Sequence, residues 1–348
     1  MIKIHSKLAT KFTYTHSMST LYEKNTNTNA KFPIYVSGNH AREILTCNRD
    51  NFKLPEGAVL LSEKEREYAE YKDRFNSHLY FESAKATRFG SPLLWSPCLP
   101  STHTILSQNF GAFPVGTVCV ADSQVSGKGR SGNVWESPYG CLMFSFTLQV
   151  DNGRMLPFLQ YVVSIAVIDA INHLSLIKGL PNLPLKIKWP NDIYANNVKL
   201  GGVLCTSTYR EKKFDVVAGI GLNVENRKPT TCLNALLEQL GCSVSPYKKE
   251  ELLRTFFDKF EDLFGVFITE GFKPLECSYY EKWLHSGQEV ILEERENDST
   301  MKISLVIKGL SPTGYLLATD DQMEAYELHP DGNSFDFLKG LVRTKLQS

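Results

Sequence analysis

The chain has 348 residues, of which 42% are hydrophobic and 22% are charged, a composition typical of a globular protein with room for more than one domain. Lysine plus arginine balances aspartate plus glutamate at 38 each, so no overall charge favours nucleic acid or an anionic membrane surface, and any anion site has to be local. No apolar run approaches the roughly 18 residues of a membrane span, so we expect a protein that does not cross a membrane.

The first 85 residues give little chemistry. Residues 1–32 are rich in lysine, serine and threonine and contain Glu23 as their only acid, which is typical of an organelle transit segment, with a disordered tail as an equal alternative. Met18 is a second candidate start. Residues 33–85 are expected to form an extension of unknown role, with a strand at 58–61 and a charged helical stretch at 62–75.

The elements become better defined after Leu93. Residues 156–176 place apolar side chains at helical spacing and predict a core helix. Ser245 and Pro246 predict the start of a second long helix, which has a phenylalanine-rich face and ends at Gly271. Strand-like segments between and before these helices are 113–124, 141–150, 185–189, 199–209 and 214–224, the last two joined as a hairpin by a charged turn. Beyond Trp283, short strands predict a small all-β unit.

The cysteines and histidines give no sign of a metal site. The eight cysteines contain no C-x-x-C pair and lie mostly in apolar runs, which favours reduced, structural thiols. The eight histidines form neither H-E-x-x-H nor another close metal-ligand spacing. These patterns argue against a zinc enzyme.

The segment GKGRSG at 127–132 matches the dinucleotide fingerprint G-x-G-x-x-G and, with the following valine, the glycine loop of protein kinases. A dinucleotide fold needs these glycines to open a helix, whereas Pro138 and Gly140 follow here and prevent one. A kinase also needs V-A-I-K, H-R-D and D-F-G segments, and the sequence has none of them. A Walker loop fails because Asp122 and Gly129 stand where it needs a glycine and a hydroxyl residue.

What remains is a loop whose glycines free the backbone and whose Lys128 and Arg130 supply two cations, as a phosphate or a developing oxyanion requires. A solvated surface loop is the competing interpretation. Strand 214–224 favours the anion site, because its alternation puts apolar residues on one face and Gly219, Gly221 and Asn223 on the other.

Two further segments place glycines or charged residues near the end of a predicted strand. Gly201 and Gly202 lie just after Lys199. In KWPND at 188–192, a lysine ends a strand and an Asn-Asp pair follows a proline-fixed corner. Such a corner suits an anion together with a metal ion, although a surface turn has the same pattern.

Taken together, GKGRSGNVW, KWPNDIY, KLGGVL and GIGLNV, in this order, resemble the biotin protein ligases, also called holocarboxylase synthetases. The resemblance covers about residues 90–345, and the segments WSPCLPSTH, VWESPYGCLMFSFTL and YELHPDGNSFDFLKGLV are most similar to plant members. It implies an α+β fold: a mixed, largely antiparallel sheet with helices, of the class II synthetase-like kind, at 86–285, and a small C-terminal β-barrel at 286–348. The helix-turn-helix domain of some bacterial relatives is missing, so no DNA role is implied.

The resemblance also implies an activity. The family condenses biotin with MgATP to biotinyl-5′-adenylate and pyrophosphate, and then transfers biotin to a specific lysine of a biotin carboxyl carrier domain. The expected partners are carrier domains of biotin-dependent carboxylases such as acetyl-CoA carboxylase, with no nucleic acid and no membrane, and the expected location is the chloroplast, the cytosol or both. Because two anions have to meet, positioning and charge neutralisation are expected to dominate catalysis.

The roles of individual residues follow by resemblance alone. The residues expected to bind biotin are Ser101, Thr102, His103, Gln124, Lys128, Gly129, Arg130, Lys199 and Gly202. The residues expected to contact ATP or the adenylate are Gly127, Lys128, Arg130, Gly132, Trp135, Asn191, Gly219, Gly221 and Asn223. The implied catalytic residues are Arg130, Lys188, Lys199 and Asp192, and Asp192 is also the candidate Mg²⁺ ligand.

Two expectations concern the loop and the competing functions. Ordering residues 126–132 costs roughly 1 to 2 kcal/mol each, so we predict a loop that is mobile when empty and ordered over the adenylate, with Trp135 either beneath it or in the core. The nearest alternative enzyme is a lipoate ligase or octanoyl transferase acting on a carrier lysine. A non-catalytic small-molecule sensor is an alternative of another class.

Overall fold

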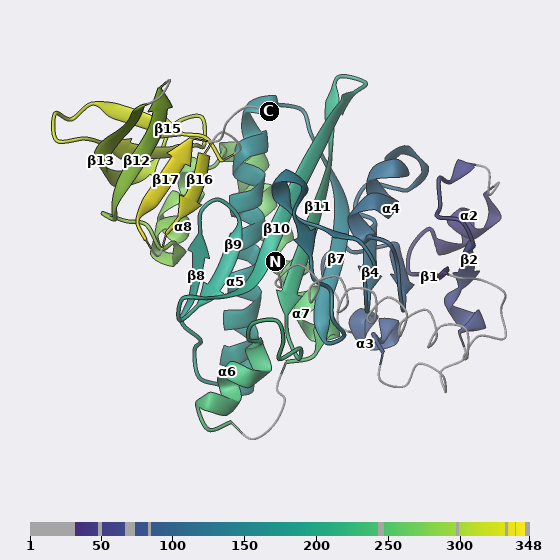
Figure 1. Ribbon diagram of the computed structural model, residues 1–348. Coiled ribbons are helices and arrows are strands. Elements are labelled where there is room, and N and C mark those ends of the chain that lie inside the picture. Colours follow the sequence, from purple (N-terminus) through teal and green to yellow (C-terminus); the bar gives the residue numbers. More distant parts are fainter. Residues whose placement is uncertain are drawn as a thin grey trace, which may run out of the picture.

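The computed structural model (Figure 1) describes residues 32–47, 51–66, 74–82, 85–242, 247–296, 299–330, 333–337 and 339–344. A nine-stranded sheet with the order β2-β1-β3-β4-β7-β11-β10-β9-β8 forms its centre. Its strands are β1 (Phe32–Ser37), β2 (Ala58–Ser62), β3 (Leu93–Ser96), β4 (Val118–Ala121), β7 (Cys141–Val150), β8 (Leu185–Lys188), β9 (Asp192–Ala195), β10 (Val198–Arg210) and β11 (Lys213–Asn223). The pairs β1–β2 and β3–β4 are parallel and the other neighbours are antiparallel, which confirms the expected mixed, largely antiparallel sheet.

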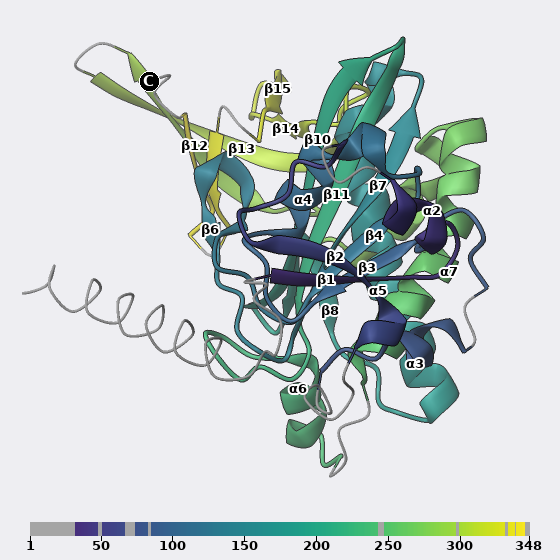
Figure 2. The ribbon, with the colours of Figure 1, turned by 90° about the vertical axis from the view of Figure 1, so that its right-hand side faces the viewer.

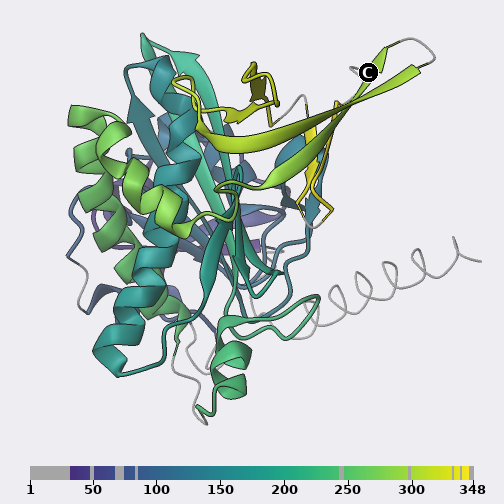
Figure 3. The same cartoon turned by 90° about the vertical axis from the view of Figure 1, so that its left-hand side faces the viewer.

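Helices cover both faces of this sheet. Helices α5 (Leu156–Lys178) and α7 (Lys249–Glu270) lie together on one face (Figure 2, Figure 3). Helix α4 (Thr102–Gln108) covers the other face, where its buried Ile105 packs in a cluster with Val217 of β11. The remaining helices are α2 (Ala41–Thr46), α3 (Ser77–Phe81), α6 (Leu233–Gln239) and α8 (Glu276–Lys282), with single 3₁₀ turns at Glu63–Glu65, Phe110–Ala112, Arg130–Gly132, Gly153–Met155 and Lys273–Leu275.

Helix α5 matches the predicted core helix. Pro157 stands in its first turn, where no intrahelical N–H is needed, and Gly179 ends it in the left-handed conformation with φ 64°. The stretch Gly153–Lys178 is long and apolar enough to cross a membrane by length and composition, so the expectation that no such run exists was wrong. In the structure 61% of its apolar window is buried, as expected of a core helix.

An aromatic cluster joins α7 to the sheet. Phe256, Phe257 and Phe260 of α7 lie within 4.9–5.7 Å, ring centre to ring centre, of Phe146 in β7, in edge-to-face contacts. The helix begins at Lys249, with Lys248 still extended, so its start is later than expected; Ser245 and Pro246 lie outside the described residues. Truncating one of these buried rings to alanine is expected to cost about 3–5 kcal/mol of folding free energy.

The C-terminal unit is a second, six-stranded sheet with the order β15-β14-β13-β12-β17-β16, and it stands beside the β8 edge (Figure 1). Its strands are β12 (Glu289–Glu296), β13 (Ser299–Leu310), β14 (Leu316–Thr319), β15 (Ala325–Leu328), β16 (Asn333–Asp336) and β17 (Leu341–Thr344). Among the described residues its end strands β15 and β16 are not paired with each other, so the expected barrel is a half-barrel.

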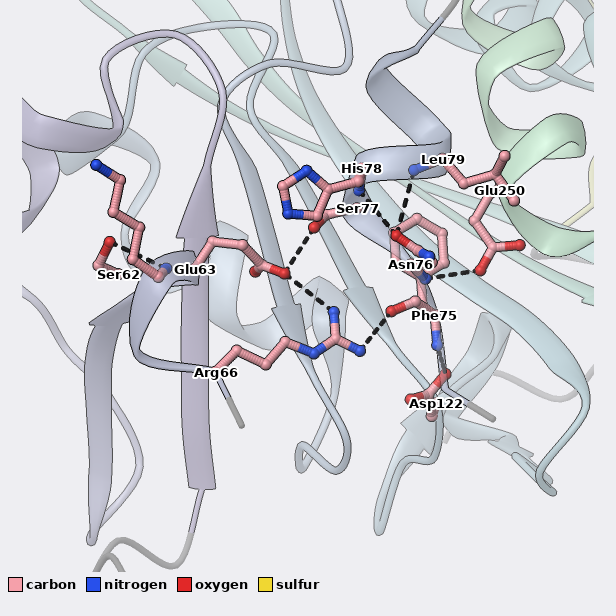
Figure 4. A network of polar contacts seen from close by, with 11 residues as sticks. Ser62, Glu63, Arg66, Phe75, Asn76, Ser77, His78, Leu79, Asp122 and Glu250 are labelled. Carbon is pink, nitrogen blue, oxygen red and sulfur yellow. Dashed lines mark hydrogen bonds and ion pairs between the residues drawn. The ribbon is translucent and has the colours of Figure 1, made fainter. Parts of the chain in front are cut away.

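The extension at 33–85 continues the main sheet at the edge opposite the half-barrel. Its β1 pairs with β3, and its following segment is held by buried polar contacts (Figure 4). The guanidinium of Arg66 donates to Glu63 at 3.0 Å and to the carbonyl of Phe75 at 2.8 Å, while Ser77 donates to the same Glu63 oxygen at 2.7 Å. The stretch 62–75 was expected to be helical; its described residues, 62–66 and 74–75, contain the 3₁₀ turn Glu63–Glu65 and no α-helix, and residues 67–73 lie outside the described part.

Candidate active site

A cavity of about 590 Å³ lies over the glycine-bearing part of β10 and β11, between the segment 127–135 and the C-terminal unit. Its size is that of a small-molecule site. The apolar face of β11 points to the α5/α7 core, as the alternation predicts, and Gly219 and Gly221 face the cavity. A Cβ at Gly219 would lie 3.1 Å from the hydroxyl of Ser145, so a glycine at this position keeps side-chain atoms out of the cavity.

The segment GKGRSG does not open a long helix. It forms a two-stranded hairpin of β5 (Gly127–Lys128) and β6 (Val134–Trp135) around the single 3₁₀ turn Arg130–Gly132. The hairpin is closed by a hydrogen bond from the Gly129 N–H to the carbonyl of Asn133 at 2.8 Å. A helix N-terminus for a pyrophosphate is therefore absent at this described segment, in agreement with the exclusion of a dinucleotide fold.

Trp135 belongs to β6 of this hairpin, and its side chain lies on the underside of the hairpin and lines the cavity. A Cβ at Gly221 would come within 2.5 Å of its indole ring, so the glycine of β11 makes room for the tryptophan. The Lys199 ammonium lies 5.4 Å from the ring centre, in the range of a cation–π contact. Of the two positions expected for Trp135, the structure shows the one beneath the loop.

One end of the cavity is polar and uncharged. Ser101 caps α4, and the Gln124 side-chain oxygen accepts from the backbone N–H of Thr102 at 2.8 Å. The Thr102 hydroxyl lies 2.9 Å from that of Ser145. Burial, followed by the positive charge of Lys128, lowers the pKa of His103 from 6.5 to about 4, so its imidazole is neutral at physiological pH.

The other end carries the charges. Lys199 Nζ and Asp192 Oδ1 form an ion pair at 2.7 Å. Across the cavity, Arg130 donates to the Asn191 side-chain oxygen at 3.4 Å, so the glycine hairpin contacts the KWPND corner. Burial lowers the pKa of Lys188, partly offset by the nearby Asp192. The described residues that line the cavity include four cationic side chains and one carboxylate, that of Asp192; the cations are Lys128, Arg130, Lys188 and Lys199.

Most of the residues chosen from the sequence meet in this one cavity. Those that line it are Ser101, Thr102, His103, Gln124, Lys128, Gly129, Arg130, Trp135, Lys188, Asn191, Asp192, Lys199, Gly202, Gly219 and Gly221. Three chosen residues do not line it. Gly127 is buried where a Cβ would lie 2.6 Å from the Trp135 carbonyl, a Cβ at Gly132 would meet nothing within 4 Å, and Asn223 donates to Thr230 instead.

Other lining residues were missed. Ser145 lies on β7 inside an apolar run, and Pro330 and Phe335 come from the C-terminal unit. Ser145 could have been found as the one hydroxyl residue of β7 whose register partner is Gly219. Nothing in the local sequence around Phe335 indicates that it reaches a site on the other sheet.

The comparisons with known proteins agree with this geometry. Residues 95–223 match the family model described as "Biotin/lipoate A/B protein ligase family". Two Arabidopsis thaliana proteins, "Biotin--protein ligase 1, chloroplastic" and "Biotin--protein ligase 2", are each 52% identical over 303 residues, covering 86% of this chain and 83% and 92% of their own lengths.

A solved structure, the biotin protein ligase from Aquifex aeolicus in complex with biotin and ATP, aligns with a TM-score of 0.54 and 27% identity. It covers 69% of this chain and 96% of that one. The fold, the cavity and these relatives lead to one conclusion: the chain belongs to the biotin protein ligase family.

Proposed function

We propose that the cavity over β10 and β11 is where this biotin protein ligase activates biotin with ATP as biotinyl-5′-adenylate and then transfers the biotin to a lysine of a carrier protein. One observation carries the proposal: a neutral polar end and a cationic end share one cavity of about 590 Å³. The ureido ring of biotin needs hydroxyl and amide partners, and its carboxylate and the phosphates need cations.

The neutral end is assigned to the biotin ring. Ser101, Thr102 and Gln124 present hydroxyl and amide groups there, and the Thr102–Gln124 hydrogen bond fixes the amide's orientation. A neutral His103 adds no charge to this end. The biotin carboxylate then extends toward Lys128, Arg130 and Lys199.

In the first step a biotin carboxylate oxygen attacks the α-phosphorus of ATP, and the bond to the bridging oxygen of pyrophosphate breaks. Lys128 and Arg130 of the hairpin and Lys199 of β10 line the path of these anions and neutralise the charge that builds up on the phosphorus-bound oxygens. In the second step the acceptor amine attacks the acyl carbon and AMP leaves. Asp192, the one carboxylate among the described lining residues, is assigned to receive the amine proton.

Mg²⁺ fits this cavity only together with the nucleotide. The described residues hold no group of three or more His, Cys, Asp or Glu that could bind a metal, and Mg²⁺ is commonly held by one or two carboxylates plus substrate phosphates. Asp192 would supply the protein oxygen. A bound Mg²⁺ would neutralise the triphosphate.

The acceptor is assigned to the carrier domains of biotin-dependent carboxylases, because a ligase of this family needs a protein lysine as its second substrate. The name "Biotin--protein ligase 1, chloroplastic" belongs to one relative. Together with the basic, hydroxyl-rich start of the chain it supports a chloroplast location, with the cytosol as the second compartment.

The experiment is pyrophosphate release with MgATP and either biotin or lipoate. We expect release that depends on biotin. Pyrophosphate release with lipoate but not with biotin would show a lipoate ligase. Binding of biotin without pyrophosphate release would show a small-molecule sensor.

A further inference from the structure

Trp189 is the second residue of the KWPND corner, and both of its N–H groups are hydrogen bonded away from the cavity. Its backbone N–H donates to Nε2 of His285 at 2.9 Å. Its indole N–H donates to the hydroxyl of Tyr161 at 2.9 Å. The corner that carries Lys188, Asn191 and Asp192 is thus fixed from behind by two partners that the cavity does not include.

The His285 contact continues into the C-terminal unit. Nδ1 of His285 lies 2.9 Å from the side-chain oxygen of Gln288, and the Gln288 amide donates to the carbonyl of Phe337 at 2.8 Å. Because Nε2 accepts from Trp189, the ring proton is on Nδ1 and donates to Gln288. Three hydrogen bonds therefore connect the corner with the segment that carries the cavity-lining Phe335.

The second contact also ends in the C-terminal unit. The Tyr161 hydroxyl donates to the carbonyl of Gly314, in the turn between β13 and β14, at 2.6 Å. A Cβ at Gly314 would lie 3.0 Å from Pro157 of α5, so this turn packs closely on the helix. Trp189 is therefore connected to the half-barrel at two separate points.

The surroundings of His285 keep it a hydrogen-bond acceptor. The side chain is fully buried, and its ring lies 5.0 Å from that of Phe335 and 5.6 Å from that of Trp283. Burial, with a smaller contribution from the Lys188 charge, lowers its pKa to about 4. A neutral imidazole can accept from the Trp189 N–H, whereas a protonated one cannot.

We propose that His285 is a positioning residue for the ATP-dependent step. Through Trp189 it holds Lys188, Asn191 and Asp192 in place opposite Phe335, and so shapes the cationic end of the cavity, where the phosphates of ATP are expected to bind. This inference rests on the proposed function. Among the described contacts, Thr102 and Gln124, which are assigned to the biotin ring, have no hydrogen bond to Trp189, His285 or Gln288. Biotin affinity in the absence of ATP is therefore expected to depend on His285 less than the KM for ATP does.

Two substitutions separate the roles of the two ring nitrogens. In His285→Gln the amide oxygen reaches the place of Nε2 and still accepts from Trp189. In His285→Asn the amide nitrogen takes the place of Nδ1 and still donates to Gln288, but nothing reaches Trp189. The exposed His173 of α5 provides the control His173→Asn.

The test uses the full chain and measures pyrophosphate release against ATP concentration, biotin affinity without ATP by calorimetry, and the melting temperature. His285→Asn is expected to raise KM for ATP roughly tenfold, the effect of one unpaired buried donor, with a clearly smaller change in biotin affinity. His285→Gln is expected to stay within about threefold of wild type, because its hydrogen bond is kept. His173→Asn is expected to match wild type.

Equal KM values for the Asn and Gln variants, or a parallel loss of biotin affinity, would overturn the inference, since a merely structural histidine affects both ends. If His285→Asn does not fold, Gln288→Leu replaces it, with a smaller rise in KM for ATP expected and no rise counting against the proposal. A wild-type protein that releases no pyrophosphate with biotin would instead contradict the proposed function itself.

Discussion

Asp192 of β9 and Lys199 of β10 form an ion pair, with 2.7 Å between Oδ1 and Nζ. Gly202 is the register partner of Asp192, and a Cβ there would lie 3.2 Å from Oδ1. The glycine therefore leaves room for the ion pair at the edge of the cavity. The pair matters because the single carboxylate among the described lining residues would otherwise repel the incoming anions.

Lys199→Met should abolish this neutralisation. It leaves Asp192 negative beside the biotin carboxylate and the phosphates, so we expect the rate of biotin-dependent pyrophosphate release to fall by about 10²–10³, the range seen when one transition-state partner is removed. Lys308→Met, on an exposed position of β13, is the matched control. A Lys199→Met enzyme that keeps more than half of the wild-type rate would contradict the assignment.

Arg130→Gly should impair retention of the adenylate more than its formation. Arg130 is part of the hairpin that covers the cavity and contacts the corner through Asn191 at 3.4 Å. We expect pyrophosphate release to continue while biotin appears on lysines of an unrelated bystander protein, detected by mass spectrometry. Arg154→Gly, at an exposed arginine, should label no bystander. Labelling confined to the carrier lysine at the wild-type rate would refute the prediction.

Gly221→Ala should displace Trp135. The added methyl would lie within 2.5 Å of the indole ring, so hairpin and strand cannot keep their positions. We expect a destabilisation of about 1–3 kcal/mol, typical of overpacking, and weaker adenylate binding, measured by urea unfolding and calorimetry. Gly265→Ala in α7 is the control, because a Cβ there meets nothing within 4 Å. Equal stability of the two variants would argue against the close packing.

Arg66→Met should weaken the attachment of the N-terminal extension. Arg66 and Glu63 form a buried ion pair at 3.0 Å, and removing one partner leaves the other charge buried. Such a change typically costs about 3–5 kcal/mol of folding free energy. Chemical denaturation measures it, with Arg42→Met at an exposed arginine as the control. A loss no greater than that of the control would show that the network contributes little.

His103 should make stability depend on acid pH. Its pKa is lowered by burial from 6.5 to about 4, so the folded state binds the proton less readily than the unfolded chain. Its contribution is fully present above pH 6.5 and is lost as the pH falls toward 4, with a total of roughly 3 kcal/mol. His103→Gln should flatten the unfolding free energy over this interval. An unchanged slope would contradict a buried, neutral histidine.

Local patterns predicted much of the fold. The alternation of β11 placed its glycines on the cavity side, and the exit of GKGRSG into Pro138 rather than a helix matched the observed hairpin. In the described part of the charged stretch 62–75 the structure has a 3₁₀ turn in place of the predicted α-helix, and Glu63 and Arg66 form a buried ion pair there. Composition cannot distinguish a solvated helix from such a pair.

The parts of the site that the sequence did not reveal depend on contacts between distant segments. The Trp189–His285 bond joins residues 96 positions apart, and Phe335 reaches the cavity from a different sheet. His285 lies in none of the motifs, and although Trp189 belongs to KWPND and Phe335 to the segment YELHPDGNSFDFLKGLV, neither segment indicates these contacts. Only the relative placement of the two sheets brings them to the KWPND corner.

The most direct test of the account is the intact mass of a purified carrier domain after incubation with biotin, MgATP and either the wild-type protein or Lys199→Met. We predict one biotin adduct, on one lysine, with the wild-type protein and almost none with the variant over the same time. Equal labelling by the two proteins, or none by the wild type, would contradict the claim that this cavity activates and transfers biotin.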